Sequence, residues 1–240
     1  MTARPEEEIQ LDFDRRRRTG LDESIFAQRK SAEQLHVIFE TAHARDASLL
    51  ITRLDRQKYD ALAPRWSHQL DYCGVSQSAF FGSCARARGG GVPRVAIVAA
   101  GSSDASVARE AQRTLEFSGV AARLFVDVGV AGLWRLTQHL DAISAFPIVI
   151  AVAGMDAALP TVLGGLIAGC IIAVPTSVGY GVAAGGHAAL HSVLASCAPG
   201  IVAVNIDNGY GAACAALRMI GRSALWGEPC RAEVDAQPAG

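Results

Sequence analysis

The sequence predicts a doubly wound α/β protein with a parallel sheet, and two observations carry this prediction. Three β-branched runs, IVIAV, IIAV and IVAV, lie between residues 148 and 204, and each ends in a polar or glycine-rich turn. Continuous apolar runs bounded by turn signals are typical of parallel strands that are covered on both faces. No charged residue occurs between Asp156 and Asp207, a gap of 50 residues, so we expect most of this stretch to be buried.

The rest of the chain also alternates between strand and helix patterns. Ser31 and Gln34 form a capping box, which begins the first expected helix. The expected elements are a helix over 31–43, a strand over 48–54, a short helix over 55–62, a strand over 95–100, a helix ending at Gly119, a strand over 121–128, a helix over 132–140 and a last helix over 212–220. Strands that alternate with helices over about 125 residues favour a doubly wound sheet.

Glycine, proline and charge divide the chain. Residues 64–93 end in Gly89–Gly91 and Pro93, and we expect a linker there. We therefore predict an N-terminal segment over 1–93, an α/β domain over 94–221 and a loosely ordered tail over 222–240. The first 93 residues hold 27 of the 45 charged residues. Since large exposed apolar surfaces are rare on monomers, the charge-poor remainder predicts a homo-oligomer.

Composition excludes several classes of protein. A formal net charge of -1 gives no sign of a nucleic-acid or anionic-membrane partner. Residues 157–174 are uncharged over the length of a membrane span, but Pro160 and Gly164–Gly165 favour a buried soluble core. The N-terminus lacks the apolar core of a secretory signal, and the six cysteines show neither CxxC nor zinc spacing. We expect a cytoplasmic protein with reduced thiols.

Ligands of such sheets bind at the carboxyl ends of the strands, so the turns there are the first candidates for chemistry. The first turn, GSSD, comprises Gly101, Ser102, Ser103 and Asp104. It offers backbone N–H groups and two hydroxyls at a helix N-terminus, which suits an anion. Serine and aspartate are also ordinary capping residues, and from the turn alone a plain N-cap is favoured.

The next two turns place charged side chains at strand ends. Asp127 ends the second strand, and Arg135 lies early in the next helix. The two residues could form a charged pair on the rim of the sheet, or they could bind the substrate. Asp156 stands between two hydrophobic segments in VAGMDAALP. A lone carboxylate in an apolar setting is costly unless it is paired or used, so we favour proton transfer for Asp156.

Three further features are candidates. The last turn, NIDNGYG, gathers Asn205, Asp207 and Asn208, which is more than capping requires. Cys197 lies in SCAPG just before the last strand, and from the residues alone a small buried hydrophobe is favoured over a reactive thiol. The run Arg15–Arg18 favours a solvated surface, although with Lys30 it could also serve a phosphate-bearing ligand.

The turns GSSD, DVGVAG, VAGMDAALP, PTSVGYG, SCAPG and NIDNGYGA occur in order with compatible spacing. Together they resemble the nickel-pincer-nucleotide biosynthesis carboxylase/hydrolase family, LarB, of the lactate racemase cofactor pathway. The N-terminal stretch LDFDRRRRTG with KSAEQL resembles the leading segment of that family. The C-terminal domain of the family is related to the aminoimidazole ribonucleotide carboxylase PurE. The resemblance thus implies a PurE-like, flavodoxin-like sheet with a small N-terminal α/β appendage, and a homo-octamer.

The resemblance also implies an activity in the first step of nickel-pincer cofactor biosynthesis. Members carboxylate the pyridinium ring of nicotinic acid adenine dinucleotide at C5 and hydrolyse its phosphoanhydride. The products are pyridinium-3,5-biscarboxylic acid mononucleotide and AMP. Carbon dioxide or bicarbonate is the co-substrate, and no tightly bound cofactor is implied. Mg²⁺ would fit, because cleavage of a phosphoanhydride develops charge that a cation stabilises.

The resemblance gives roles to the candidate residues. Cys197 matches the position that forms an adduct with the pyridinium ring, a task that requires a thiolate which also leaves easily. With this context a functional role for Cys197 outranks the buried hydrophobe, and Asp156 is expected to manage a proton nearby. We expect the substrate to contact Gly101, Ser102, Ser103, Asp104, Asp127, Arg135, Asn205, Asp207, Asn208 and Lys30.

The chain departs from the family pattern at three places. Trp134 stands where members usually have histidine, Asp156 stands where they usually have glutamate, and the glycine-rich N-terminal loop is AQRKS. One alternative is an aminoimidazole ribonucleotide carboxylase or mutase, but its two histidine-bearing turns are replaced by VAGLWR and VAGMDAALP. A second alternative is a non-catalytic nucleotide-binding relative, which Trp134 favours and the retained Cys197 opposes.

Overall fold

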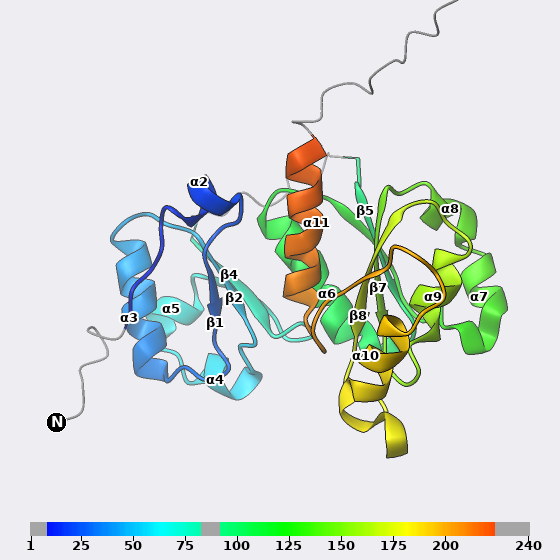
Figure 1. The fold of residues 1–240 in the computed structure, drawn as a ribbon. Helices are drawn as coiled ribbons and strands as arrows, with labels where there is room; N and C mark the ends of the chain where they lie inside the picture. The colour runs from blue at the N-terminus through cyan, green and yellow to red at the C-terminus, as the bar shows by residue number, and fades with distance from the viewer. Residues whose placement is uncertain (1–8, 83–91, 224–240) are drawn as a thin grey trace, which may run out of the picture.

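Five parallel strands form a sheet in the C-terminal part of the computed structural model, which describes residues 9–82 and 92–223 (Figure 1). The strands are β5 (Val95–Ala99), β6 (Ala122–Phe125), β7 (Ile148–Ala153), β8 (Cys170–Pro175) and β9 (Val202–Ala203). Their order is β6-β5-β7-β8-β9 and every pairing is parallel. This is the flavodoxin-like order, in which the chain reverses direction across the sheet beside β5.

Helices cover both faces of this sheet, as the apolar strands predict. One face packs against α6 (Ala105–Phe117) and α11 (Gly209–Ser223). The opposite face packs against α7 (Leu133–Thr137), α8 (Leu140–Ser144), α9 (Ala158–Gly164) and α10 (His187–Leu194). All residues of β5 and β7 are buried, and full burial of a valine or isoleucine stabilises a fold by about 1.5–3 kcal/mol. The doubly wound α/β prediction is therefore confirmed.

A smaller mixed sheet forms the N-terminal unit. Its strands are β1 (Ser24–Phe26), β2 (Leu49–Thr52), β3 (Leu70–Cys73) and β4 (Ser78–Phe81), in the order β1-β2-β4-β3. The helices α2 (Arg15–Thr19), α3 (Ala32–His43), α4 (Arg56–Asp60) and α5 (Pro64–Ser67) accompany them. The core is aromatic: Trp66, Phe39 and Phe81 are fully buried against one another. The Ser31–Gln34 capping box opens α3 as predicted.

One expectation about secondary structure is wrong, and one stretch contains elements that the sequence did not predict. Residues 64–82 form α5 and a hairpin of β3 and β4, whose buried face completes the aromatic core. The helix expected over 132–140 is two short helices, since α7 ends at Thr137 and α8 begins at Leu140. The boundary placed at Gly89–Gly91 and most of the expected tail lie outside the described residues. No helix in the described ranges is both long and apolar enough to cross a bilayer.

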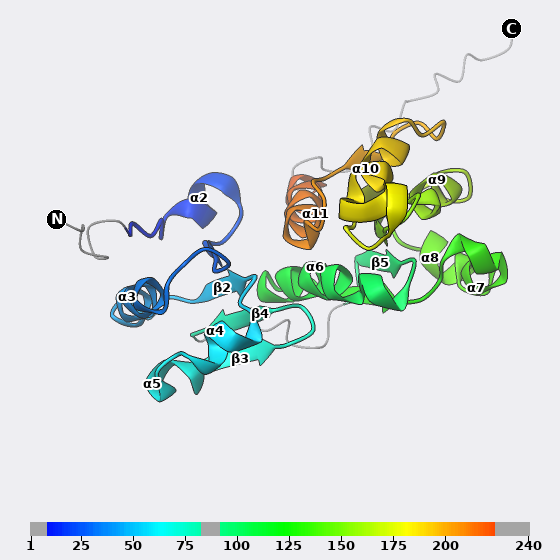
Figure 2. The ribbon, with the colours of Figure 1, turned by 90° about the horizontal axis from the view of Figure 1, so that it is seen from below.

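Helix α6 lies between the two sheets and joins them (Figure 2). Its Ala108, Ala111 and Leu115 pack on the large sheet. On the other side, the Arg113 guanidinium stacks 3.8 Å from the centre of the Phe80 ring and donates to the Asp71 carbonyl. Phe117 packs against Leu50 and Phe80 of the small sheet. We call this contact region between the two units the seam.

Candidate active site

A cavity of about 430 Å³ opens at the carboxyl edge of the large sheet. Its walls come from the turns after β5, β6, β7 and β8, which is where ligands of such sheets bind. The polar lining consists of Ser103, Asp104, Asp127, Arg135 and Asp156. The cavity thus brings together side chains that lie more than 50 residues apart in the sequence.

The turns at this edge are held in uncommon backbone conformations. Asp127, Met155, Ala157 and Asp207 all have left-handed φ angles, between 47° and 62°. For residues other than glycine this conformation is unfavourable, and it persists only where the surroundings fix it. Gly154 shows how tightly these turns pack, because a Cβ atom there would overlap the Val178 carbonyl oxygen. Strained turns beside a cavity are typical of functional sites.

Asp127 and Arg135 form an ion pair in the cavity wall. The Arg135 Nη1 atom lies 2.9 Å from the Asp127 Oδ2 atom, and the arginine side chain is 30% exposed. The guanidinium therefore presents part of its surface to the cavity while the carboxylate fixes its direction. A planar guanidinium held in this way suits a carboxylate or phosphate ligand.

Asp104 is the buried acid of the cavity. Its Oδ2 atom accepts the Gly101 N–H at 2.9 Å, and its Oδ1 atom accepts the Thr176 hydroxyl at 2.6 Å. Burial raises the pKa of Asp104 above its ordinary 3.8, and the charge of Asp207 adds to this, against the two hydrogen bonds. The GSSD turn is therefore more than a helix cap, since its acid links two strand ends.

The setting expected for Asp156 is wrong. Apolar neighbours in the sequence suggested a desolvated carboxylate, but Asp156 is exposed at the cavity mouth. Its Oδ1 atom lies 3.4 Å from the Ala158 backbone nitrogen at the start of α9. The apolar neighbours are buried because they belong to β7 and α9, whereas Asp156 sits on the turn between them. An exposed carboxylate remains able to accept a proton from a ligand in the cavity.

The NIDNGYG turn lies outside this cavity but is linked to it. The Ser177 N–H donates to the Asp207 Oδ1 atom at 2.8 Å, and neighbouring Thr176 holds Asp104. Asn205 and Asn208 bond to nearby backbone, with the Asn208 Oδ1 atom accepting the Gly211 N–H at 2.8 Å. The segment after β8 thus couples the first and the last turns of the carboxyl edge.

The sequence reasoning missed two residues at the seam. Arg53, which follows β2, lies 3.4 Å from the buried carboxylate of Glu110 on α6 and also donates to the Asp207 carbonyl oxygen. Burial raises the pKa of Glu110, while the charge of Arg53 opposes that rise. Arginine directly after a strand in ITRLD was the available signal for Arg53. Glu110 lies at mid-helix, so the sequence offered no comparable signal for it.

The structure places Cys197 apart from the cavity lining. The thiol is free and exposed, in the turn between α10 and β9. This turn leads into a strand, whereas the cavity is built from turns that follow strands. The neighbouring Ser196 hydroxyl contacts the Thr161 hydroxyl of α9 at 2.7 Å. No cysteine lines the cavity within the described part of one chain, so the expectation that Cys197 stands among its turns is not met there.

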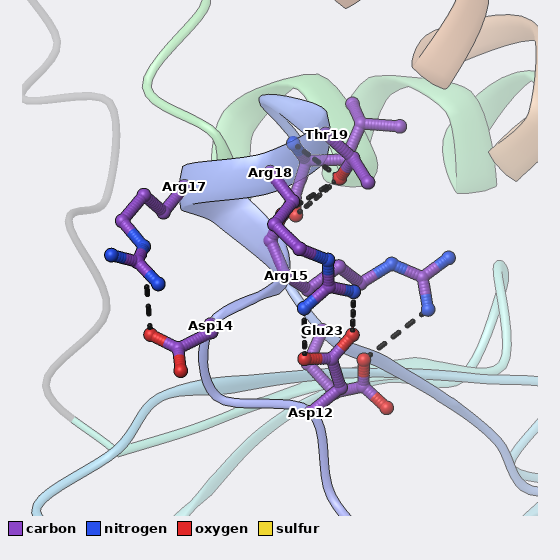
Figure 3. A network of polar contacts seen from close by, with 8 residues as sticks. Asp12, Asp14, Arg15, Arg17, Arg18, Thr19 and Glu23 are labelled. Atoms are coloured by element: carbon purple, nitrogen blue, oxygen red, sulfur yellow. Dashed lines mark hydrogen bonds and ion pairs between the residues drawn. The ribbon is translucent and has the colours of Figure 1, made fainter.

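The N-terminal cations are engaged elsewhere. Each arginine of Arg15–Arg18 pairs with a nearby carboxylate, as Figure 3 shows for most of them, and Arg18 binds Asp12 through two contacts of 2.9 and 2.6 Å. The solvated interpretation of the run therefore fits. Lys30 is half-buried in the turn after β1, where its N–H donates to the Ala27 carbonyl. Neither Lys30 nor the exposed Ser102 lines the cavity.

Comparison with known proteins decides the family. The model of the LarB/PurE-like N-terminal domain matches residues 7–80, and the AIR carboxylase model matches residues 94–228. The chain belongs to the LarB family. The chain is also similar to the uncharacterized protein MJ0165 of Methanocaldococcus jannaschii, with 34% identity over 212 residues, which are 86% of this chain and 82% of that protein.

Membership of the LarB family supports a carboxylase-type enzyme of nickel-pincer cofactor biosynthesis. The two matched domains coincide with the two sheets, and α6 of the LarB C-terminal domain carries the seam between them. The PurE-like fold predicted from the turns is confirmed by the AIR carboxylase match and by the strand order.

Proposed function

We propose that this protein carboxylates the pyridinium ring of nicotinic acid adenine dinucleotide at C5 and hydrolyses its phosphoanhydride. The products would be pyridinium-3,5-biscarboxylic acid mononucleotide and AMP. One observation carries the proposal: a LarB-type chain retains a free, exposed thiol at Cys197 together with a polar cavity at the carboxyl edge of its PurE-like sheet.

The proposed chemistry begins with the thiolate, because an electron-poor pyridinium ring does not attack carbon dioxide. The Cys197 sulfur forms a bond to a ring carbon, and the displaced electron pair neutralises the ring nitrogen. The adduct is enamine-like, so its C5 can form a carbon–carbon bond with carbon dioxide. The C5 proton is then lost to a base, and expulsion of the thiolate restores the aromatic ring.

The cavity residues supply the other roles. Arg135 is partly exposed and aimed by Asp127, so it can bind a carboxylate or phosphate of the substrate. Asp156 is an exposed carboxylate at the cavity mouth, so it can take the C5 proton. Mg²⁺ usually binds through one or two carboxylates together with substrate phosphates, and the exposed carboxylate of Asp156 could contribute, whereas that of Asp127 is paired with Arg135.

We further propose that the working site is shared between copies of the chain in a homo-oligomer, an octamer by the family pattern. The position of Cys197 outside the cavity of its own chain supports this proposal, in which a second copy presents the thiol to the substrate. Exposed apolar side chains accompany both parts: Met155, Tyr180 and Val182 near the carboxyl edge, and Leu194 and Val202 on either side of the Cys197 turn. Exposed apolar residues on both parts fit surfaces that cover one another.

One assay separates the candidate activities. The protein is incubated with nicotinic acid adenine dinucleotide and bicarbonate, and AMP and carboxylated nucleotide are measured by mass spectrometry. We expect both products. Turnover of aminoimidazole ribonucleotide instead would identify the purine-type activity that the matched domain model names. Binding of the dinucleotide without either product would identify a non-catalytic relative and overturn the proposal.

A further inference from the structure

Arg53 is the arginine of the N-terminal unit that reaches the last turn of the large sheet. It directly follows β2, and its backbone is left-handed with φ 55°. Its Nε atom lies 3.4 Å from the Glu110 Oε1 atom, and its Nη2 atom donates to the Asp207 carbonyl oxygen. One guanidinium therefore joins the small sheet, α6 and the NIDNGYG turn.

Glu110 is the buried carboxylate that pairs with Arg53. Its side chain is 5% exposed, and its second oxygen accepts the Tyr210 N–H at 3.2 Å, at the start of α11. A carboxylate at a helix N-terminus is favourable, but a buried one also requires a cation. Arg53 supplies that cation from the other unit. Gly209 allows the close approach, because a Cβ atom there would overlap the Val107 carbonyl oxygen of α6.

Asp207 is held by three contacts, and only one of them comes from the N-terminal unit. Its N–H donates to the Pro175 carbonyl at 2.8 Å, and its Oδ1 atom accepts the Ser177 N–H at 2.8 Å. Its carbonyl oxygen accepts from Arg53. The left-handed φ of 54° turns this carbonyl away from an ordinary strand direction. The turn that follows β9 is therefore completed by a side chain from outside the large sheet.

We propose that Arg53 is a positioning residue through which the N-terminal unit sets the conformation of the NIDNGYG turn. Its partner Glu110 neutralises the guanidinium and caps α11, so the arginine is fixed in direction before it reaches Asp207. The catalytic consequence of this inference rests on the proposed function, while the structural consequence does not. Loss of Arg53 loosens the turn and lowers turnover even when the ion pair is replaced by neutral groups.

The decisive variant is the double substitution Arg53→Met with Glu110→Gln in the full-length chain. Removing Arg53 alone would leave the buried Glu110 carboxylate without its cation, and the resulting loss of stability would mask any effect on the turn. The amide oxygen that Glu110→Gln introduces can still accept the Tyr210 N–H, and methionine is unbranched at Cβ like arginine. Arg113→Met is the matched control, because Arg113 also crosses the seam but contacts Asp71 and Ser78 instead of the turn.

Two measurements decide the inference. In hydrogen exchange with mass spectrometry, the double variant is expected to show exchange at the amides of 205–211 that is about tenfold faster, because one charge-assisted hydrogen bond is lost. Its kcat is expected to fall by about tenfold or more, with thermal stability near the wild type. Arg113→Met should lower stability and leave both the 205–211 exchange and kcat near the wild type.

Unchanged exchange at 205–211 in the double variant would overturn the inference, as would the same change in Arg113→Met. If the double variant does not fold, Arg53→Lys takes its place. Lysine keeps the charge for Glu110, but its compact ammonium lacks the planar fork by which arginine contacts Glu110 and Asp207 together, so faster exchange at the turn with retained stability is again expected. A wild-type protein that does not turn over the dinucleotide would refute the proposed function alone, because the exchange result would still decide the role of Arg53.

Discussion

The two ends of the large sheet differ in what they contain. At the carboxyl edge, turns with left-handed residues enclose a polar cavity, and hydrogen bonds and an ion pair fix the acids and the arginine there. The turn that enters β9 contains an exposed thiol flanked by exposed apolar residues. We call these the cavity end and the thiol end. In the proposed mechanism the cavity end binds and aligns the substrate and the thiol end supplies the nucleophile, and within one chain the two ends are not joined.

The largest expected effect comes from the thiol end. Cys197→Ser keeps the shape of the side chain but offers a far weaker nucleophile at neutral pH, so carboxylation should fall at least about 100-fold. Dinucleotide binding and folding should be retained, since Cys197 is exposed and outside the cavity. Rates are measured by product formation and binding by calorimetry.

Cys170→Ser is the control for this prediction. Cys170 is half-buried at the start of β8, with its sulfur 3.7 Å from the Met219 sulfur, so the change should lower stability more than turnover. If Cys197→Ser carboxylates the dinucleotide at the wild-type rate, Cys197 takes no part in the reaction. The contrast between the two ends of the sheet would then carry no functional meaning.

The next effect belongs to the cavity end. Ser103→Glu places a negative charge on the exposed GSSD turn, so we expect dinucleotide binding to weaken by about 1–3 kcal/mol through repulsion of the phosphates. Ser102→Glu is the matched control, because Ser102 is also exposed but does not line the cavity. Calorimetry should show a clearly smaller loss for Ser102→Glu. Equal affinities of both variants and the wild type for the dinucleotide would show that the GSSD turn does not contact the substrate.

A pH dependence of stability tests the buried acid of the cavity. The pKa of Asp104 is raised by burial, so the folded protein holds its proton to a higher pH than the unfolded chain does. This contribution to the free energy of unfolding is fully present below the ordinary pKa of 3.8 and is lost as the pH rises through the folded value. The stability of the wild type relative to Asp104→Asn should therefore fall as the pH rises from about 3.8 toward neutrality.

Urea unfolding of both proteins at several pH values measures this difference. Glu110 is also a buried acid with a raised pKa, but it is present in both proteins and its contribution cancels. A difference in stability that is independent of pH would show that Asp104 is not desolvated in solution.

The smallest effect is expected from α2. Arg16 and Arg17 form ion pairs with Asp22 and Asp14, both arginine side chains are exposed, and such surface pairs contribute little. Arg16→Gln and Arg17→Gln should leave both the melting temperature and the affinity for the dinucleotide near the wild type. A marked loss of affinity for the dinucleotide would show that the run Arg15–Arg18 contacts the substrate, so that the binding site would include part of the N-terminal unit.

The large sheet could be predicted from the sequence because local patterns decide it. The apolar runs of β7 and β8 are buried on both faces, and the turns that follow them contain the glycine and polar residues that end a strand. The hairpin of β3 and β4 was missed because its strands are short, and their burial depends on Trp66 and Phe39 from elsewhere in the chain.

The site was predicted only in part for the same reason. The strand-end positions of Asp104, Asp127 and Arg135 follow from order along the chain, and the structure places all three at one cavity. The exposure of Asp156 depends on where β7 ends relative to α9, which hydrophobicity alone does not show. The contact of Arg53 with Glu110 joins residues 57 positions apart, and only the packing of α6 on the small sheet reveals it.

A complementation experiment tests the division of the site most directly. Chains with Cys197→Ser and chains with Asp127→Lys, which sets a cation against Arg135, are coexpressed under different affinity tags, and the mixed oligomers are isolated. If the cavity of one copy receives Cys197 from another, about a quarter of the sites are intact and carboxylation returns to about that fraction of the wild-type rate. Mixed oligomers as inactive as either parent would contradict a site shared between copies.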